Sequence, residues 1–185
     1  MANPSNARIN GENVTQLDSL NIRKNLYVNG VALNPAAYVT ASRITDLSIG
    51  TTAIDVPFET TGAIKNIEVD GTDITFLVGG VYQATIEFSI EKVSSGGVQA
   101  AFGWLRLNGV DVEGSAFGAA LTNQSPYYNG TFISAIGNVN AGDVLTVGAS
   151  ASENAAAQLD SATATDGPSI PAARIALFKI EGEEF

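Results

Sequence analysis

The segment that decides the fold is residues 81–91, which read VYQATIEFSIE. Apolar side chains occupy every second position from Tyr82 to Ile90, and polar side chains occupy the positions between them. This alternation predicts a β-strand that buries one face and exposes the other to water. The next segment, residues 98–107, reads VQAAFGWLRL and is nearly apolar on both faces. It predicts a strand that is covered on both sides.

Outward from these two strands, the chain alternates short apolar runs with turn sequences. Asn-Gly or Asp-Gly pairs, which favour tight hairpin turns, begin at residues 10, 29, 70, 108, 129 and 166. Helical periodicity is nearly absent, so the pattern predicts an all-β sandwich or barrel. Residues 150–171 carry few large apolar side chains and are expected to form mostly a long surface loop. The further strands that we expect are a hairpin over 66–78 and single strands over 53–58, 131–136, 144–149 and 174–180.

The first 42 residues differ from the rest of the chain. Their large apolar side chains are sparse, and four of the nine basic residues lie within residues 1–43. That is too little apolar mass for a separate core. We therefore expect an N-terminal anchoring arm over residues 1–42, which buries itself on a partner or on the main domain, and a β-domain over residues 43–185. The residues expected to anchor the arm are Leu20, Ile22, Arg23, Lys24, Leu26, Tyr27 and Val28.

The composition excludes several classes of function. The 185 residues are 45% apolar and 15% charged, which is typical of a folded chain. A net charge of −10 argues against nucleic acid and anionic membranes as partners, because both attract basic surfaces. No apolar run approaches the ~20 residues of a membrane span. The chain has neither Cys nor His, which removes thiol and imidazole chemistry and the commonest zinc ligands. We expect no enzymatic activity, no cofactor and no metal.

Carboxylates are the remaining reactive groups, and two sets of them leave glycoside hydrolysis or calcium binding as alternatives. Asp111 and Glu113 follow a hairpin turn, and two carboxylates at a suitable separation could hydrolyse a glycoside. Glu68, Asp70 and Asp73 surround a glycine turn and could bind calcium through oxygen. Both sets fall at positions that we expect on the surface, where solvated charge is the simpler interpretation.

Strands that are apolar on both faces also indicate self-association. A two-sheet sandwich buries one face of each sheet, so the second face of residues 98–107 and 174–180 is expected to meet another subunit, with closed symmetry. Two adjacent aromatic residues, Tyr127 and Tyr128, lie in an expected loop and are candidates for surface recognition of a sugar or a protein. The residues expected at the subunit interface are Phe102, Trp104, Leu105, Leu107, Leu177 and Phe178.

A series of short motifs resembles the trimeric jelly rolls of the complement-subunit and tumour-necrosis-factor type over about residues 53–182. The motifs are Gly80-Val81-Tyr82, Leu107-Asn108-Gly109, Asn140-Ala141-Gly142-Asp143 and Ala176-Leu177-Phe178. Aromatic residues are usual in that family where this chain has Ile74, Ala84 and Ile86. The resemblance implies an antiparallel jelly-roll sandwich that forms a homotrimer.

The arm carries a second resemblance. Leu26-Tyr27-Val28-Asn29-Gly30-Val31 ahead of a small jelly roll is similar to tailed-bacteriophage virion proteins: head decoration (cement) proteins, head fibres and tail-fibre tips. This implies a viral structural protein, a capsid decoration protein on the outer surface of the virion whose arm binds the major capsid protein. The alternative is a fibre-tip or lectin-like jelly roll that binds a host surface glycan or receptor. A cellular trimeric signalling ligand is a more remote third.

Overall fold

The chain divides into two compact units, Met1–Pro35 and Ala36–Phe185. The computed structural model describes residues 26–28, 31–33, 36–93, 98–123, 127–154, 157–162 and 168–181, and this part of the chain contains strands and no helix. In the first unit, β1 (Leu26–Val28) and β2 (Val31–Leu33) form an antiparallel hairpin in which Val28 is paired with Val31. The hairpin brackets the Asn29-Gly30 pair, which is the turn signal that the sequence provides.

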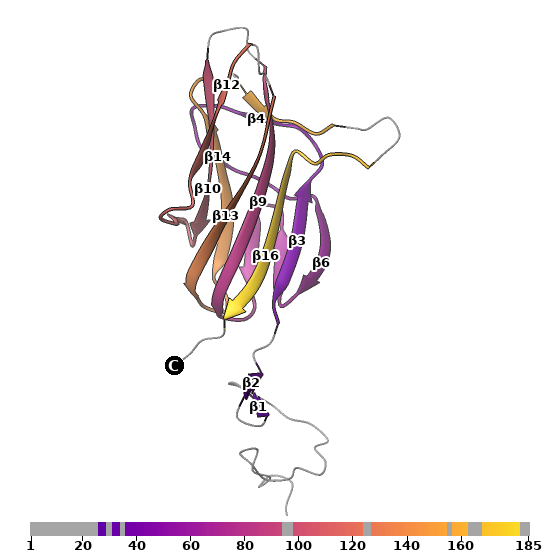
Figure 1. Cartoon of the computed structure of the whole chain (residues 1–185), viewed down its shortest axis with the longest axis vertical. Coiled ribbons are helices and arrows are strands. Elements are labelled where there is room, and N and C mark those ends of the chain that lie inside the picture. The colour runs from indigo at the N-terminus through magenta and orange to yellow at the C-terminus, as the bar shows by residue number, and fades with distance from the viewer. Residues whose placement is uncertain are drawn as a thin grey trace, which may run out of the picture. The chain divides into compact units, whose positions relative to one another are not determined.

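The second unit is a sandwich of two antiparallel sheets (Figure 1). The front sheet is built around β9 (Gly80–Lys92), which pairs with β13 on one side and with β16 on the other. Beyond β16 lie β3 and then β6, while β15 and β4 extend the sheet beside the end of β9. The bounds of these strands are β3 Tyr38–Arg43, β4 Leu47–Ile49, β6 Thr60–Lys65, β13 Tyr127–Val139, β15 Ala157–Leu159 and β16 Ala173–Glu181.

The back sheet is built around β10 (Gln99–Leu107) and β14 (Val144–Ala151), which pair along seven residues from Ala101 to Leu107. The two short strands β11 and β12 flank the other side of β10, whereas β5 and β8 flank β14 and β7 pairs with β8. The strand order of the two sheets makes this an antiparallel jelly roll, as expected. The remaining bounds are β5 Ile54–Asp55, β7 Ile67–Asp70, β8 Asp73–Phe76, β11 Val110–Asp111 and β12 Phe117–Leu121.

The core lies between the sheets and follows the alternation seen in the sequence. Every even-numbered residue of β9 is buried and every odd-numbered one is partly exposed, so the prediction for residues 81–91 is confirmed. Facing β9, the inward positions of β10 include Gly103, where a side chain would collide with the rings of Phe88 and Phe117. Phe117 in turn stacks on Phe132, with ring centroids 4.5 Å apart. Aromatic side chains therefore fill the space that this glycine leaves.

The domain boundary lies earlier than the sequence indicates. Residues 38–42, expected to belong to the arm, form all of β3 but its last residue. This strand pairs with β16 from Tyr38 to Arg43 and with β6 on its other side. The jelly roll therefore begins at Ala36, and the expected boundary between residues 42 and 43 is corrected to Pro35 and Ala36. Two other expectations also change: β13 starts at Tyr127, not at Thr131, and β15 lies within the expected loop 150–171.

On the outer face of β10, aromatic side chains lie over glycines of the two neighbouring strands. Trp104 is paired with Gly148 across the sheet, and a Cβ built on that glycine would lie 2.6 Å from the indole ring. Phe102 covers Gly118 of β12 in the same way, at 3.2 Å. Aromatic rings that lie flat on cross-strand glycines lose solvent contact within their own sheet. Apolar residues on both faces of this strand therefore do not require a second subunit.

Candidate functional site

The six residues expected at the subunit interface do not form one surface. Leu105 and Leu177 are fully buried between the sheets, and the partly buried Leu107 packs against the same core. Leu105 and Leu177 cannot meet another subunit because they have no exposed surface, and their assignment to the interface is wrong. Phe102 and Trp104 lie on the outer face of the back sheet, whereas Phe178 lies on the outer face of the front sheet.

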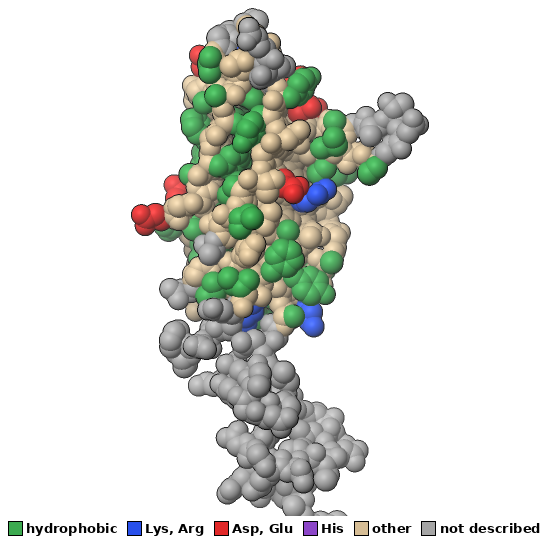
Figure 2. Space-filling model, in the orientation of Figure 1, with side chains coloured by type: hydrophobic (Ala, Val, Ile, Leu, Met, Phe, Trp, Pro, Cys, Tyr) green, Lys and Arg blue, Asp and Glu red, His purple; other side chains and the backbone are tan. Residues whose placement is uncertain are grey.

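The front sheet presents an apolar area on its outer side, over β13, β9, β16 and β3. Phe178 is 46% exposed and is the cross-strand neighbour of Tyr38, which is 37% exposed. Ile133 on β13 is 65% exposed, and Ile180 follows Phe178 on β16. Figure 2 shows hydrophobic side chains gathered over this part of the sheet. We call these four residues the apolar face.

A polar row bounds the apolar face two residues further along β9. There Glu87 is the neighbour of Thr131 on β13 and of Arg174 on β16, and Arg174 Nη1 lies 3.2 Å from Glu87 Oε2. Beyond this row the outward positions remain polar: Ser89 faces Asn129, and Glu91 faces Tyr127. The same sheet face is thus apolar near one end and polar near the other.

A groove of about 260 Å³ lies at the polar end, and it includes one of the two aromatic residues singled out in the sequence. Tyr127 is 62% exposed, and its hydroxyl donates a hydrogen bond to Glu91 Oε1 at 2.9 Å. Tyr128 points to the other face of β13, where its ring covers Gly130. The two tyrosines belong to a strand and not to a loop, so only Tyr127 faces the groove. The lining residues are Ser89, Ile90, Tyr127, Asn129, Asp160, Ala162 and Ile170.

Hydrogen bonds hold the acidic groups around this groove. The Nε2 atom of Gln158 donates to Glu91 Oε2 at 2.9 Å and to Asp160 Oδ1 at 3.1 Å. Burial, and then the charge of Glu91, raise the pKa of Asp160 above its ordinary value. The hydrogen bond to Glu91 raises the pKa of Tyr127. The sequence did not mark Asp160 or Ile170, and it marked Asn129 only as part of a turn signal, whereas this residue lies within β13. Three separate segments of the chain bring these residues together.

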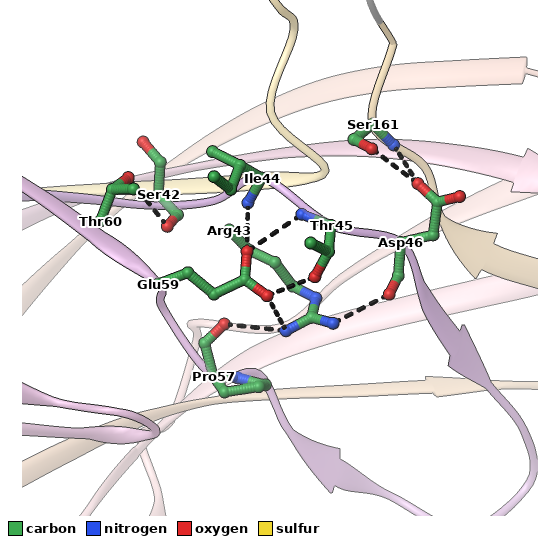
Figure 3. Close-up of polar contacts among 9 residues, drawn as sticks. All are labelled: Ser42, Arg43, Ile44, Thr45, Asp46, Pro57, Glu59, Thr60 and Ser161. Atoms are coloured by element: carbon green, nitrogen blue, oxygen red, sulfur yellow. Dashed lines mark hydrogen bonds and ion pairs between the residues drawn. The ribbon is translucent and has the colours of Figure 1, made fainter.

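Figure 3 shows a second polar cluster, which joins the link after β3 to the residue that precedes β6. Glu59 accepts hydrogen bonds from the backbone N–H groups of Ile44 and Thr45 at 2.9 and 3.0 Å, and from the Thr45 hydroxyl. The largely buried Arg43 lies 3.2 Å from Glu59 and donates to the carbonyl oxygen of Asp46 at 2.8 Å. Asp46 Oδ1 accepts from the N–H and hydroxyl of Ser161. The cluster fixes chain links, and we interpret it as structural.

This cluster predicts acid sensitivity. Hydrogen bonds from Thr45 lower the pKa of Glu59, and those from Ser161 lower the pKa of Asp46. A carboxyl with a depressed folded pKa contributes stability that is present above its unfolded value of about 4 and is lost as pH falls through the folded value. We expect Glu59→Gln to lower the unfolding free energy by about 1–2 kcal/mol at pH 7 and by less at pH 3. Urea titrations at both pH values measure this; an equal loss at both would contradict the assignment.

The other carboxylates of the sequence analysis are exposed or bonded to neighbouring side chains in the described structure. Asp111 accepts hydrogen bonds from Trp104 Nε1 and Arg106 Nε, both at 2.9 Å, and Arg106 lies over the indole ring. Glu113 is exposed. Among the described residues no group of three Asp or Glu side chains could hold a metal ion, and Glu68, Asp70 and Asp73 are no exception.

The expected anchoring residues lie in the first unit. Leu26, Tyr27 and Val28 form β1, whereas Leu20, Ile22, Arg23 and Lys24 lie outside the described residues. Within the described ranges, no helix is both long and apolar enough to span a membrane.

Comparisons with known proteins find likeness only among solved structures. No protein-family model matches the chain, and no curated protein matches it. The chain is similar to solved structures of murine APRIL, which are jelly rolls of the tumour-necrosis-factor class. For APRIL at pH 8.5 the identity is 10% and the TM-score 0.48, and at pH 5.0 they are 11% and 0.47. In both cases the match covers 79% of this chain and 100% of the other.

Proposed function

We propose that this chain is a non-enzymatic structural protein of a virus particle. In this proposal it forms a homotrimer through the apolar face and decorates the outer surface of a bacteriophage capsid, where its N-terminal arm binds the major capsid protein. The observation that carries the proposal is the division of the chain into a short N-terminal unit and an acidic jelly roll with an apolar area on one sheet. The resemblance of the arm to phage decoration proteins supplies the biological setting.

Self-association is supported by the exposure of large side chains. Phe178, Ile133 and Ile180 are each between 46% and 65% exposed although they lie on or beside regular strands. An exposed apolar area that is bordered by polar residues is typical of a protein interface. Closed rotational symmetry allows each copy to cover this area on its neighbour. The trimer is the closed form that the resemblance to complement-subunit jelly rolls implies.

The charge distribution supports attachment through the arm. Residues 1–35 contain three of the nine basic and two of the nineteen acidic residues, so the jelly roll carries six basic against seventeen acidic residues. Strongly acidic domains of neighbouring trimers repel one another, which keeps them apart on a crowded shell. The arm has almost no net charge, so an acidic capsid surface would not repel it.

Deleting residues 1–35 is expected to abolish attachment to capsids that lack the protein, while the jelly roll remains folded and self-associated. The physical reason is that β3, the first strand of the sandwich, starts at Tyr38, so the deletion removes no core strand. Co-sedimentation with capsids measures attachment, and light scattering measures the mass of the truncated protein.

A matched control is the longer deletion of residues 1–43, which also removes β3. This variant is expected to unfold, because β6 loses the strand that it pairs with and β16 keeps only β9 as its partner. If the chain that lacks residues 1–35 binds capsids as well as the full chain does, anchoring by the arm is wrong, and attachment runs through the jelly roll.

A further inference from the structure

The groove beside Tyr127 is separate from the surface used in the proposed assembly. It is lined by Ser89 and Asn129, whereas Ile133 of the apolar face is the neighbour of Thr85. Four residues along β9 separate Ser89 from Thr85, a distance of about 13 Å in a strand. The ion pair between Glu87 and Arg174 lies between the two surfaces. The proposed assembly through the apolar face therefore does not account for the groove.

The walls of the groove combine an aromatic ring with aliphatic groups. Tyr127 supplies the ring, and its hydrogen bond to Glu91 fixes the orientation of that ring before any ligand arrives. Ile170, which is 49% exposed, and Ala162 pair across an isolated β-bridge and form the second apolar part of the lining. A ligand that fits here presents C–H groups to an aromatic face.

The remaining lining groups form hydrogen bonds. Asn129 offers an amide that both donates and accepts, Ser89 offers a hydroxyl, and Asp160 offers a carboxylate. Gln158 donates a hydrogen bond to Oδ1 of Asp160, which orients that carboxylate. Among the described residues no side chain donates a hydrogen bond to Oδ2, so this atom can accept one from a ligand. Neutral donors and acceptors beside a carboxylate and an aromatic ring match a molecule that has an apolar face and hydroxyl groups around its edge.

We propose that this groove binds one pyranose ring of a neutral saccharide, with an apolar face of the sugar against Tyr127 and its hydroxyl groups bonded to Asp160 and Asn129. The volume of about 260 Å³ is smaller than that of the pockets that take drug-sized ligands, about 300–1,000 Å³, and suits a single ring. Glu91 and Asp160 make the site acidic, which disfavours phosphorylated or sialylated ligands by repulsion of like charges. The inference goes beyond the structural role proposed above and does not depend on it.

The test uses the full chain and a panel of methyl glycosides of glucose, galactose and mannose together with N-acetylglucosamine. Amide chemical shifts recorded during titration locate and quantify binding. We expect at least one sugar to shift the resonances of Tyr127, Asn129 and Ala162, with a dissociation constant of about 1 mM, as suits a small ligand held by few contacts. Inorganic phosphate is expected to leave these resonances unchanged.

Three variants distinguish the proposed contacts. Tyr127→Ala is expected to weaken sugar binding about 10-fold or more, because it removes the stacking ring. Tyr127→Phe keeps the ring and is expected to bind within about 3-fold of the native chain. Phe102→Ala removes an exposed aromatic residue from the opposite sheet and is the matched control, with unchanged binding.

Four outcomes would overturn the proposal. The first is that no sugar shifts any resonance, and the second is that the shifts are confined to residues outside the groove. The third is that Tyr127→Ala binds a sugar as tightly as the native chain does. The fourth is that the cation tetramethylammonium, added as a further probe, binds in the groove while no sugar does. The last would identify a site for cations. Light scattering of the same samples reports self-association separately, so loss of sugar binding and loss of assembly are distinguishable.

Discussion

Gly103→Val is expected to destabilise the jelly roll by about 3 kcal/mol or more, the upper end of what overpacking costs. A Cβ at this position would lie 2.3 Å from Phe117 and 2.4 Å from Phe88. Neither ring has space to move aside, because Phe88 is almost fully buried and Phe117 is stacked on Phe132. For a domain of this size we expect the melting temperature to fall by about 6–12 °C. Urea denaturation measures the loss as a lower midpoint with an unchanged slope.

Gly137→Ala is the matched control within the same sandwich. Gly137 is exposed on β13, and a Cβ built there meets no atom within 4 Å. Its replacement is expected to change the unfolding free energy by less than about 1 kcal/mol. If the two variants had equal stability, the close packing of β10 against the aromatic rings would be wrong.

If the chain associates through the apolar face as proposed, Phe178→Asp is expected to leave it a monomer of normal stability. Phe178 is 46% exposed in the single chain, so its loss costs little core packing, while a carboxylate buried at an interface loses its hydration without a partner. Association should weaken by about 100-fold or more, as for residues that dominate an interface. Sedimentation velocity over a range of protein concentrations measures the change.

The control for this experiment is Phe102→Asp. Phe102 is similarly exposed, at 43%, but lies on the back sheet. It is expected to leave association unchanged and to cost some stability, because its ring covers Gly118. Loss of association in this variant alone would show that subunits meet through the back sheet.

The sequence predicted the fold best where burial alternates. Residues 81–91 appear in the structure as β9 with the expected faces, and the Asp70-Gly71 turn joins β7 to β8 as expected. Prediction was poorest where a strand has few large side chains. β3 reads YVTASR and was assigned to the arm, because its inward Val39 and Ala41 are too small to stand out. The partners that complete its burial, in β16 and β6, are far away in the sequence.

The candidate surfaces were predicted only in part. Phe178 and Tyr127 are exposed, and the interface and recognition roles expected for them stay predictions. Leu105 and Leu177 are buried, because a strand with two apolar faces does not always need a second subunit to cover it. The rings of Phe102 and Trp104 instead pack on Gly118 and Gly148 of the neighbouring strands. The sequence alone does not show which glycine lies opposite which ring. Asp160 reaches the groove through β15, a strand inside an expected loop.

The position of β3 has a mechanical consequence. A force that is transmitted through the N-terminal unit enters the sandwich at β3. This strand pairs through backbone hydrogen bonds with β16 on one side and with β6 on the other (Figure 1). A pull along the strand axis would load both ladders in shear, so that many hydrogen bonds resist at once instead of opening one after another. Because β16 also pairs with β9, this load passes from β3 into the middle of the front sheet, so the buried strands share it.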